Sequence, residues 1–145
     1  MNAERQAIAS LARLALLRQR EVEREQAELA GKQRLRERYQ RNLDRLDTLC
    51  RNVGASGSDL AVAALNSGNY KHTVMQLALE HRNDLALHDA DLAVSRQALA
   101  DASRRHESLN LLLERQRADL QRALATQEQK RQDEMATQMW QRRDT

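Results

Sequence analysis

Apolar residues recur every seven positions through the second half of the chain. A heptad repeat of this length predicts an α-helix that lays one narrow stripe against another helix. Such a helix cannot bury its stripe alone, so we look for function in contacts between helices. A second row lies half a repeat away and is partly polar. The two rows are Leu85, Leu92, Leu99, His106, Leu113 and Leu120, and Val74, His81, His88, Ser95, Ala102, Leu109, Gln116 and Ala123.

The first third of the chain has a looser version of this pattern. Its sevenfold row is expected to slip after residue 29, and Glu25, Lys32 and Gln33 leave the middle of the helix with a thin apolar face. Gly31 adds a weak point, since glycine costs about 1 kcal/mol relative to alanine inside a helix. The row consists of Ile8, Ala15, Val22 and Leu29, and continues as Leu35, Tyr39, Leu43, Leu46 and Cys50.

These patterns predict an all-α fold, in which two long helices form an antiparallel coiled-coil hairpin. We expect one elongated domain over residues 1–145, with helices at about 3–52 and 69–143 and a connection at 53–68. Proline is absent, and three of the four glycines fall between Gly54 and Gly68, which places the break there. Gly54 is the expected C-cap, and Ser58 or Asp59 the N-cap of a short helical turn within the connection.

The turn selects a register in which facing positions add up to 120 near the connection and 121 further away. This pairs Leu46 with Val74, Leu43 with Leu77 and Tyr39 with His81, and later Leu29 with Leu92, Val22 with Leu99, Ala15 with His106 and Ile8 with Leu113. A register shifted by seven fits the two rows equally well. The first helix then ends opposite about residue 118, so the C-terminal part protrudes. Its exposed Met and Trp side chains suit insertion into another protein, with fraying as the structural alternative.

Composition leaves little room for a globular core. The chain has 2% aromatic and 31% charged residues and a mean hydropathy of −0.81. This is typical of long exposed helices, and the sustained heptads argue against the alternative of disorder. We expect no signal peptide, because the apolar run 7–17 contains Arg13, and no membrane span. The single cysteine suits a reducing compartment, so a cytoplasmic location is expected.

The net charge of +3 raises the question of nucleic acid. Residues 32–51 are the densest basic stretch, with seven basic and three acidic residues. Basic and acidic residues alternate elsewhere, and Tyr39 is the only aromatic side chain beside this stretch, so we expect no nucleic-acid partner. The chain has three lysines among its 24 basic residues. Genomic base composition can explain the excess of arginine, and arginine-based docking sites for carboxylates are the functional alternative.

No constellation points to catalysis, a metal or a cofactor. His81 and His88 share a helix face, but a spacing of seven puts them about 10 Å apart, too far to share an ion. The other two histidines are His72 and His106. Cys50 has no neighbouring histidine and sits on the apolar face, which favours inert packing. No glycine-rich phosphate loop is present. We therefore expect a protein that is not an enzyme.

Three stretches in order resemble the FliJ family of flagellar type III export. The first is 11–29, with Leu-x-x-Leu, Arg-Glu-Val and Ala-x-Leu-Ala ahead of a segment rich in Tyr and Leu. The second is Asn69-Tyr70, which opens a long helix that reaches His81. The third is Lys130-Arg-Gln-Asp-Glu-Met-Ala136, similar to the family's terminal Lys-x-x-Asp-Glu-x-Ala pattern. The likeness covers nearly the whole chain.

This resemblance implies a cytoplasmic hairpin shaped like the stalk subunit of rotary ATPases, peripheral at the inner face of the membrane. Implied partners are the hexameric export ATPase, the cytoplasmic domain of the export gate, and export chaperones. The positions that match the family's gate-contact patch are Tyr39, Leu43, Leu46, Cys50, Tyr70, Val74, Leu77 and His81. The expected contacts with the ATPase ring are Leu120, Leu124, Arg131, Asp133, Glu134, Met135, Met139 and Trp140.

Three alternatives remain open at this point. One is the equivalent coiled-coil subunit of a virulence secretion system, and another is a generic coiled-coil scaffold or chaperone. The third is a basic nucleic-acid-binding hairpin. Stimulation of the cognate ATPase separates the two secretion proteins from the others, and a steep salt dependence of DNA binding would favour the last.

Overall fold

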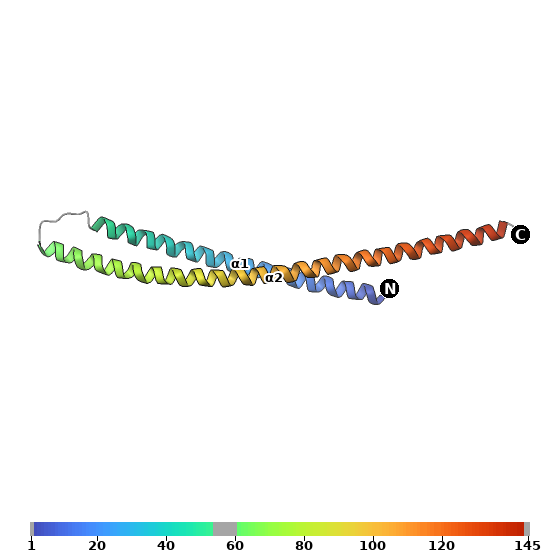
Figure 1. Cartoon of the computed structure of the whole chain (residues 1–145), viewed down its shortest axis with the longest axis horizontal. Coiled ribbons are helices and arrows are strands. Elements are labelled where there is room, and N and C mark those ends of the chain that lie inside the picture. Colours follow the sequence, from blue (N-terminus) through green and yellow to red (C-terminus); the bar gives the residue numbers. More distant parts are fainter. Residues whose placement is uncertain (1, 54–60, 144–145) are drawn as a thin grey trace. The chain divides into compact units, whose positions relative to one another are not determined.

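The computed structural model describes residues 2–53 and 61–143, which form two α-helices (Figure 1). Helix α1 spans Asn2–Val53 and helix α2 spans Ala61–Arg143. They pack against each other as an antiparallel helical hairpin, and no strand occurs in these two ranges. The all-α prediction is confirmed. Glu4 in the first turn of α1 and Arg51 in its last turn complement the helix dipole.

Helix α2 begins eight residues earlier than the sequence predicts. We placed its start near Asn69, but it starts at Ala61, and the expected break at 66–69 lies inside the helix. The Ala-rich run 61–64 favours helix strongly enough to outweigh Gly68, because glycine costs only about 1 kcal/mol there. The short turn expected within the connection is therefore the first part of α2. The predicted caps at Gly54, Ser58 and Asp59 lie outside the described residues.

The chain divides into two compact units, and both helices contribute to each. The connecting unit contains Glu23–Asp101. The terminal unit contains Met1–Val22 together with Ala102–Thr145. Within each unit the core is the seam where α1 meets α2, so burial along each helix follows the heptad repeat.

Both predicted rows of α2 lie on this seam. From Val74 to Gln116, and from Leu85 to Leu120, every residue of the two rows is buried or half-buried. Ala78, Leu92 and Ala102 are the most completely buried apolar side chains, and Ser95 is the buried polar one. The row that begins at Val74 ends where Ala123 becomes exposed.

Helix α1 follows one uninterrupted heptad, which corrects the predicted slip. Leu35 is 39% exposed, while Arg36 holds the seam position between Leu29 and Leu43. The slip was predicted from apolar side chains alone, whereas a charged arginine occupies this seam position. All members of the two α1 rows are buried or half-buried: Ile8, Ala15, Val22, Leu29, Arg36, Leu43 and Cys50, and Leu11, Arg18, Glu25, Lys32, Tyr39 and Leu46.

The register of the connecting unit also differs from the predicted one. The Tyr39 ring lies 5.8 Å from His81 and 4.5 Å from His88, measured between centroids. Tyr39 therefore faces Leu85, midway between them, and facing positions add up to 124 instead of 120 or 121. Because α2 begins earlier than expected, more of its residues precede the stretch that pairs with α1. Each α1 residue therefore faces a higher-numbered residue of α2 than predicted.

Ion pairs join the helices at two polar seam positions of α1, Lys32 and Arg36. Lys32 Nζ donates to Asp91 Oδ1 at 2.9 Å and to Ser95 Oγ at 2.7 Å. Arg36 makes a two-pronged contact with Asp89. Hydrogen bonding to Arg36 lowers the pKa of the Asp89 carboxyl, and bonding to Asp91 raises the pKa of Lys32. Lys32, which thins the apolar face of α1, and Arg36 therefore become cross-links to α2, whereas Glu25 pairs with Arg24 of its own helix.

Candidate partner-binding surfaces

Most of the predicted gate-contact residues belong to the seam of the connecting unit. Leu43 and Val74 are buried, and Tyr39, Leu46, Cys50 and His81 are half-buried. A partner cannot contact buried side chains without opening the hairpin, so we assign these six a packing role. Tyr70 and Leu77, which are 50% and 42% exposed, are the two that remain accessible. The expected pairing of Leu77 with Leu43 is wrong, because its neighbour Ala78 occupies the seam.

Leu49 extends this accessible surface and was missed by the sequence reasoning. It directly precedes the seam residue Cys50, just as Leu77 directly precedes Ala78, so both leucines flank the seam on the same side. Both are exposed, and Tyr70 lies seven residues before Leu77 on the same flank. An exposed flank position beside a seam residue is the signal that would have found Leu49. These three side chains form an accessible apolar surface on this flank, which we call the connection surface.

In the terminal unit, α2 continues as a helix in which every side chain from 125 to 142 is exposed. The positions that continue the seam become polar over this stretch. The helix therefore has no apolar stripe on which a second helix could pack as α1 does. These positions are Gln127, Lys130, Glu134, Thr137 and Gln141. Leu120 and Leu124, by contrast, are half-buried and end the seam of this unit.

The apolar residues of this segment gather on its other face. Met135, Ala136, Met139 and Trp140 follow the i, i+1, i+4, i+5 spacing that makes one helix face. At 100° per residue this face lies roughly opposite the seam positions. Met139 and Trp140 are 70% and 71% exposed, and with Ala136 and Arg142 they line a shallow hollow. We call Met135, Ala136, Met139 and Trp140 the terminal apolar cluster.

The charged residues predicted beside this cluster are exposed as well. Arg131, Asp133 and Glu134 are all exposed on α2. Asp133 accepts a hydrogen bond from Thr137 Oγ1 through its backbone carbonyl. The three are surface charges that border the apolar cluster.

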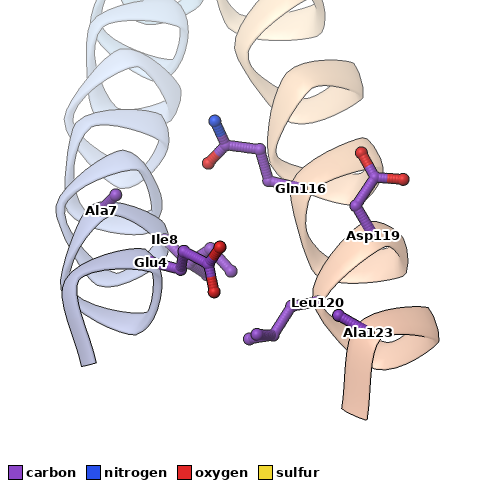
Figure 2. A pocket seen from close by; sticks show the side chains of 7 residues that line it. All are labelled: Glu4, Ala7, Ile8, Gln116, Asp119, Leu120 and Ala123. Carbon is purple, nitrogen blue, oxygen red and sulfur yellow. The ribbon is translucent and has the colours of Figure 1, made fainter. Parts of the chain in front are cut away.

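A groove opens between α1 and α2 near the start of α1 (Figure 2). Ile8 and Leu120 project into it from the two helices, and Glu4, Gln116 and Asp119 lie around it. Its volume is about 430 Å³. Asp119 also pairs with Arg122 at 3.5 Å. The seam is thus less tightly closed here than at Leu113, which is buried.

The described part of the chain offers no metal site and no membrane span. No group of three or more His, Cys, Asp or Glu side chains in residues 2–53 and 61–143 is arranged to hold an ion. Neither α1 nor α2, over the same residues, is apolar enough along its length to cross a bilayer.

A comparison with protein-family models identifies the family of this chain. The model described as "Flagellar FliJ protein" matches residues 7–145. The chain belongs to the FliJ family. No curated protein and no solved structure matches it. Membership gives this FliJ protein a role related to flagellar export, and it agrees with the helical hairpin and with the expectation of a non-catalytic component.

Proposed function

We propose that this FliJ protein binds the hexameric export ATPase through the terminal apolar cluster and promotes assembly and activity of the ring. The observation that carries the proposal is a continuous helix whose seam positions turn polar while Met135, Met139 and Trp140 gather on another face. Large exposed apolar side chains on an unpartnered helix are typical of binding hot spots. The resemblance to the FliJ family is what suggests the export ATPase as the partner.

The connection surface is the proposed contact with the cytoplasmic domain of the export gate. Leu49, Tyr70 and Leu77 are accessible on one flank of the seam. They replace the larger set that the family resemblance implies, since the other matching positions are needed to hold α1 against α2. We also propose that the protein cycles export chaperones. It would act in the cytoplasm, and it would be peripheral to the membrane through the gate alone.

Two pairs of substitutions in the same helix test the ATPase contact. Met139→Ala with Trp140→Ala removes the apolar side chains. Thr137→Ala with Gln141→Ala changes the seam-side positions of the same turns and is the matched control. We expect the first pair to weaken co-purification with the cognate ATPase and to lower its stimulation about tenfold or more, since hot-spot truncations cost about 2 kcal/mol or more.

The proposed ATPase contact would be refuted if both pairs stimulated the ATPase as well as wild type. A cognate flagellar ATPase that responds while a virulence-type ATPase does not supports the flagellar assignment. The reverse result would identify the virulence-type alternative. No response from either enzyme would leave a scaffold role as the better interpretation.

A further inference from the structure

Four arginines form one straight row on the solvent-facing side of α1 in the connecting unit. Their spacing of four, three and four residues places them on a single face of the helix over about three turns. All four are exposed. The row, which we call the arginine row, consists of Arg34, Arg38, Arg41 and Arg45.

These arginines differ from those that hold the hairpin together. Arg36 pairs with Asp89 across the seam, and Arg82 reaches Asp47 at 2.7 Å. Among the residues that the structure describes, no hydrogen bond or ion pair occupies any member of the arginine row. Arg36 and Arg82 thus have partners across the seam, whereas the row on the outer face has none in the described structure.

Acidic residues border the row on one side without neutralising it. Glu37 and Asp44 lie seven residues apart on that side, and Asp44 accepts a hydrogen bond from Gln40. Two carboxylates beside four guanidinium groups leave a net positive stripe. Neither carboxylate pairs with a member of the row in the described structure, so a partner that supplies carboxylates can engage the four guanidinium groups.

Leucines border the row on its other side. Leu35 and Leu49 are about 40% exposed. Together with Arg38 and Arg45 they occupy i, i+3, i+10 and i+14, which follow one stripe along the helix. Leu49 also lines a shallow hollow with Arg45, Asp44 and Thr48. The outer face of α1 thus combines a cationic row with an apolar margin.

We propose that this face binds an acidic amphipathic helix of a partner protein, with carboxylates on the arginine row and leucine-type side chains against Leu35 and Leu49. Arginine suits this role because its planar guanidinium group can hold a carboxylate by two hydrogen bonds. A second helix laid alongside α1 repeats at the same pitch of about 5.4 Å, so its acidic side chains can meet successive members of the row.

Nucleic acid and lipid fit the same face less well. Single-stranded nucleic acid needs aromatic platforms, and the nearest aromatic ring, Tyr39, is held between His81 and His88 in the seam. An anionic bilayer binds helices that carry a broad apolar face, whereas this stripe carries two half-exposed leucines separated by fourteen positions. The inference concerns the outer side of α1: it does not depend on the proposed ATPase contact, and it shares one residue, Leu49, with the connection surface.

The test uses the full-length chain and a synthetic helical peptide of about five turns. The peptide carries four glutamates at the spacing of the row and leucines on the adjacent stripe. A scrambled peptide of the same composition distributes the glutamates around the helix. We expect the patterned peptide to bind at least about tenfold more tightly at 0.15 M salt, by fluorescence anisotropy.

Charge reversal identifies the site. Arg38→Glu with Arg45→Glu should weaken the patterned peptide about tenfold or more, and a peptide with arginines in place of its glutamates should regain affinity for that variant. Arg13→Glu with Arg20→Glu makes the same charge change at exposed positions of the terminal unit and should alter the affinity less than about twofold. Circular dichroism confirms that each variant remains helical.

Three results would overturn the proposal. Equal binding of the patterned and scrambled peptides would show that the spacing of the glutamates does not matter. Unchanged affinity in the Arg38→Glu, Arg45→Glu variant would remove the row from the site. Tighter binding of a DNA duplex or of phosphatidylserine vesicles at the same salt would assign the face to another class of ligand.

Discussion

Leu92 shows how much of the hairpin's stability depends on a single seam residue. Its side chain is 2% exposed, so Leu92→Ala removes buried contacts and leaves a cavity. We expect the free energy of unfolding to fall by about 2–4 kcal/mol, measured by urea denaturation followed by circular dichroism. Leu87→Ala is the control, since Leu87 is 70% exposed, and it should cost less than about 0.5 kcal/mol. Equal effects would mean that residue 92 is not buried against α1.

The pair of Arg36 and Asp89 makes the stability of the connecting unit depend on pH. Because the pKa of Asp89 is lowered in the folded chain, the pair stabilises the hairpin above the usual carboxyl pKa of about 4. That contribution is lost as the pH falls through the lowered value. Asp89→Asn should therefore lower the melting temperature slightly at pH 7 and leave it unchanged at pH 2.

Comparing melting curves of the wild type and Asp89→Asn at the two pH values checks this prediction. Asp84→Asn is a suitable control, because Asp84 is also on α2 and makes no cross-helix ion pair in the described structure. A difference between Asp89→Asn and wild type that persisted at pH 2 would contradict the role of the ionised carboxyl.

At the scale of the helix, Gly31 is the replaceable weak point of α1. It lies inside the helix, and a methyl group built on it meets no atom within 4 Å apart from its chain neighbours and the adjacent backbone of α1. Gly31→Ala should therefore stabilise the chain by about 1 kcal/mol, because alanine loses less backbone entropy in a helix. The midpoint of urea unfolding measures the change. A loss of stability would show that this position needs glycine for a contact that the hairpin does not reveal.

The sequence specifies the elements of this fold better than their relative alignment. The rows from Leu85 and Val74 were predictable because apolar periodicity reports directly which face is buried. Arg36 escaped that reasoning, since its seam role depends on Asp89, a residue more than fifty positions away. The early start of α2 also escaped it, because local turn signals around Gly68 weigh less than the propensity of the helix on both sides.

The candidate surfaces were predictable to a smaller extent. Met139 and Trp140 stood out as exposed apolar residues, but their separation from the seam face appears only when the heptad is followed to Gln141. Near the connection, Leu43 and Val74 were predicted as possible contacts and are buried. A sequence pattern identifies the apolar positions of a helix, and the register decides which of them remain available to a partner.

At the scale of the molecule, the seam and the proposed ATPase contact lie in different segments. Side chains 125–142 are exposed, so they contribute no packing to the seam. A chain that ends at Ala125 should therefore keep its urea midpoint and lose stimulation of the ATPase. Sedimentation and urea unfolding of the shortened chain check that it stays folded, and the ATPase assay checks the loss of stimulation. A marked fall in the midpoint would mean that the C-terminal segment packs on the hairpin.

Helix α2 runs without interruption from Leu120, at the end of the seam, to Trp140. Its helical phase therefore fixes the direction in which the terminal apolar cluster points. One alanine inserted after Gln127 would turn the cluster by about 100°, and seven would restore its direction to within about 20° while moving it about 10 Å outward. ATPase stimulation that disappears with one added residue and returns with seven would show that the partner reads orientation as well as side-chain chemistry.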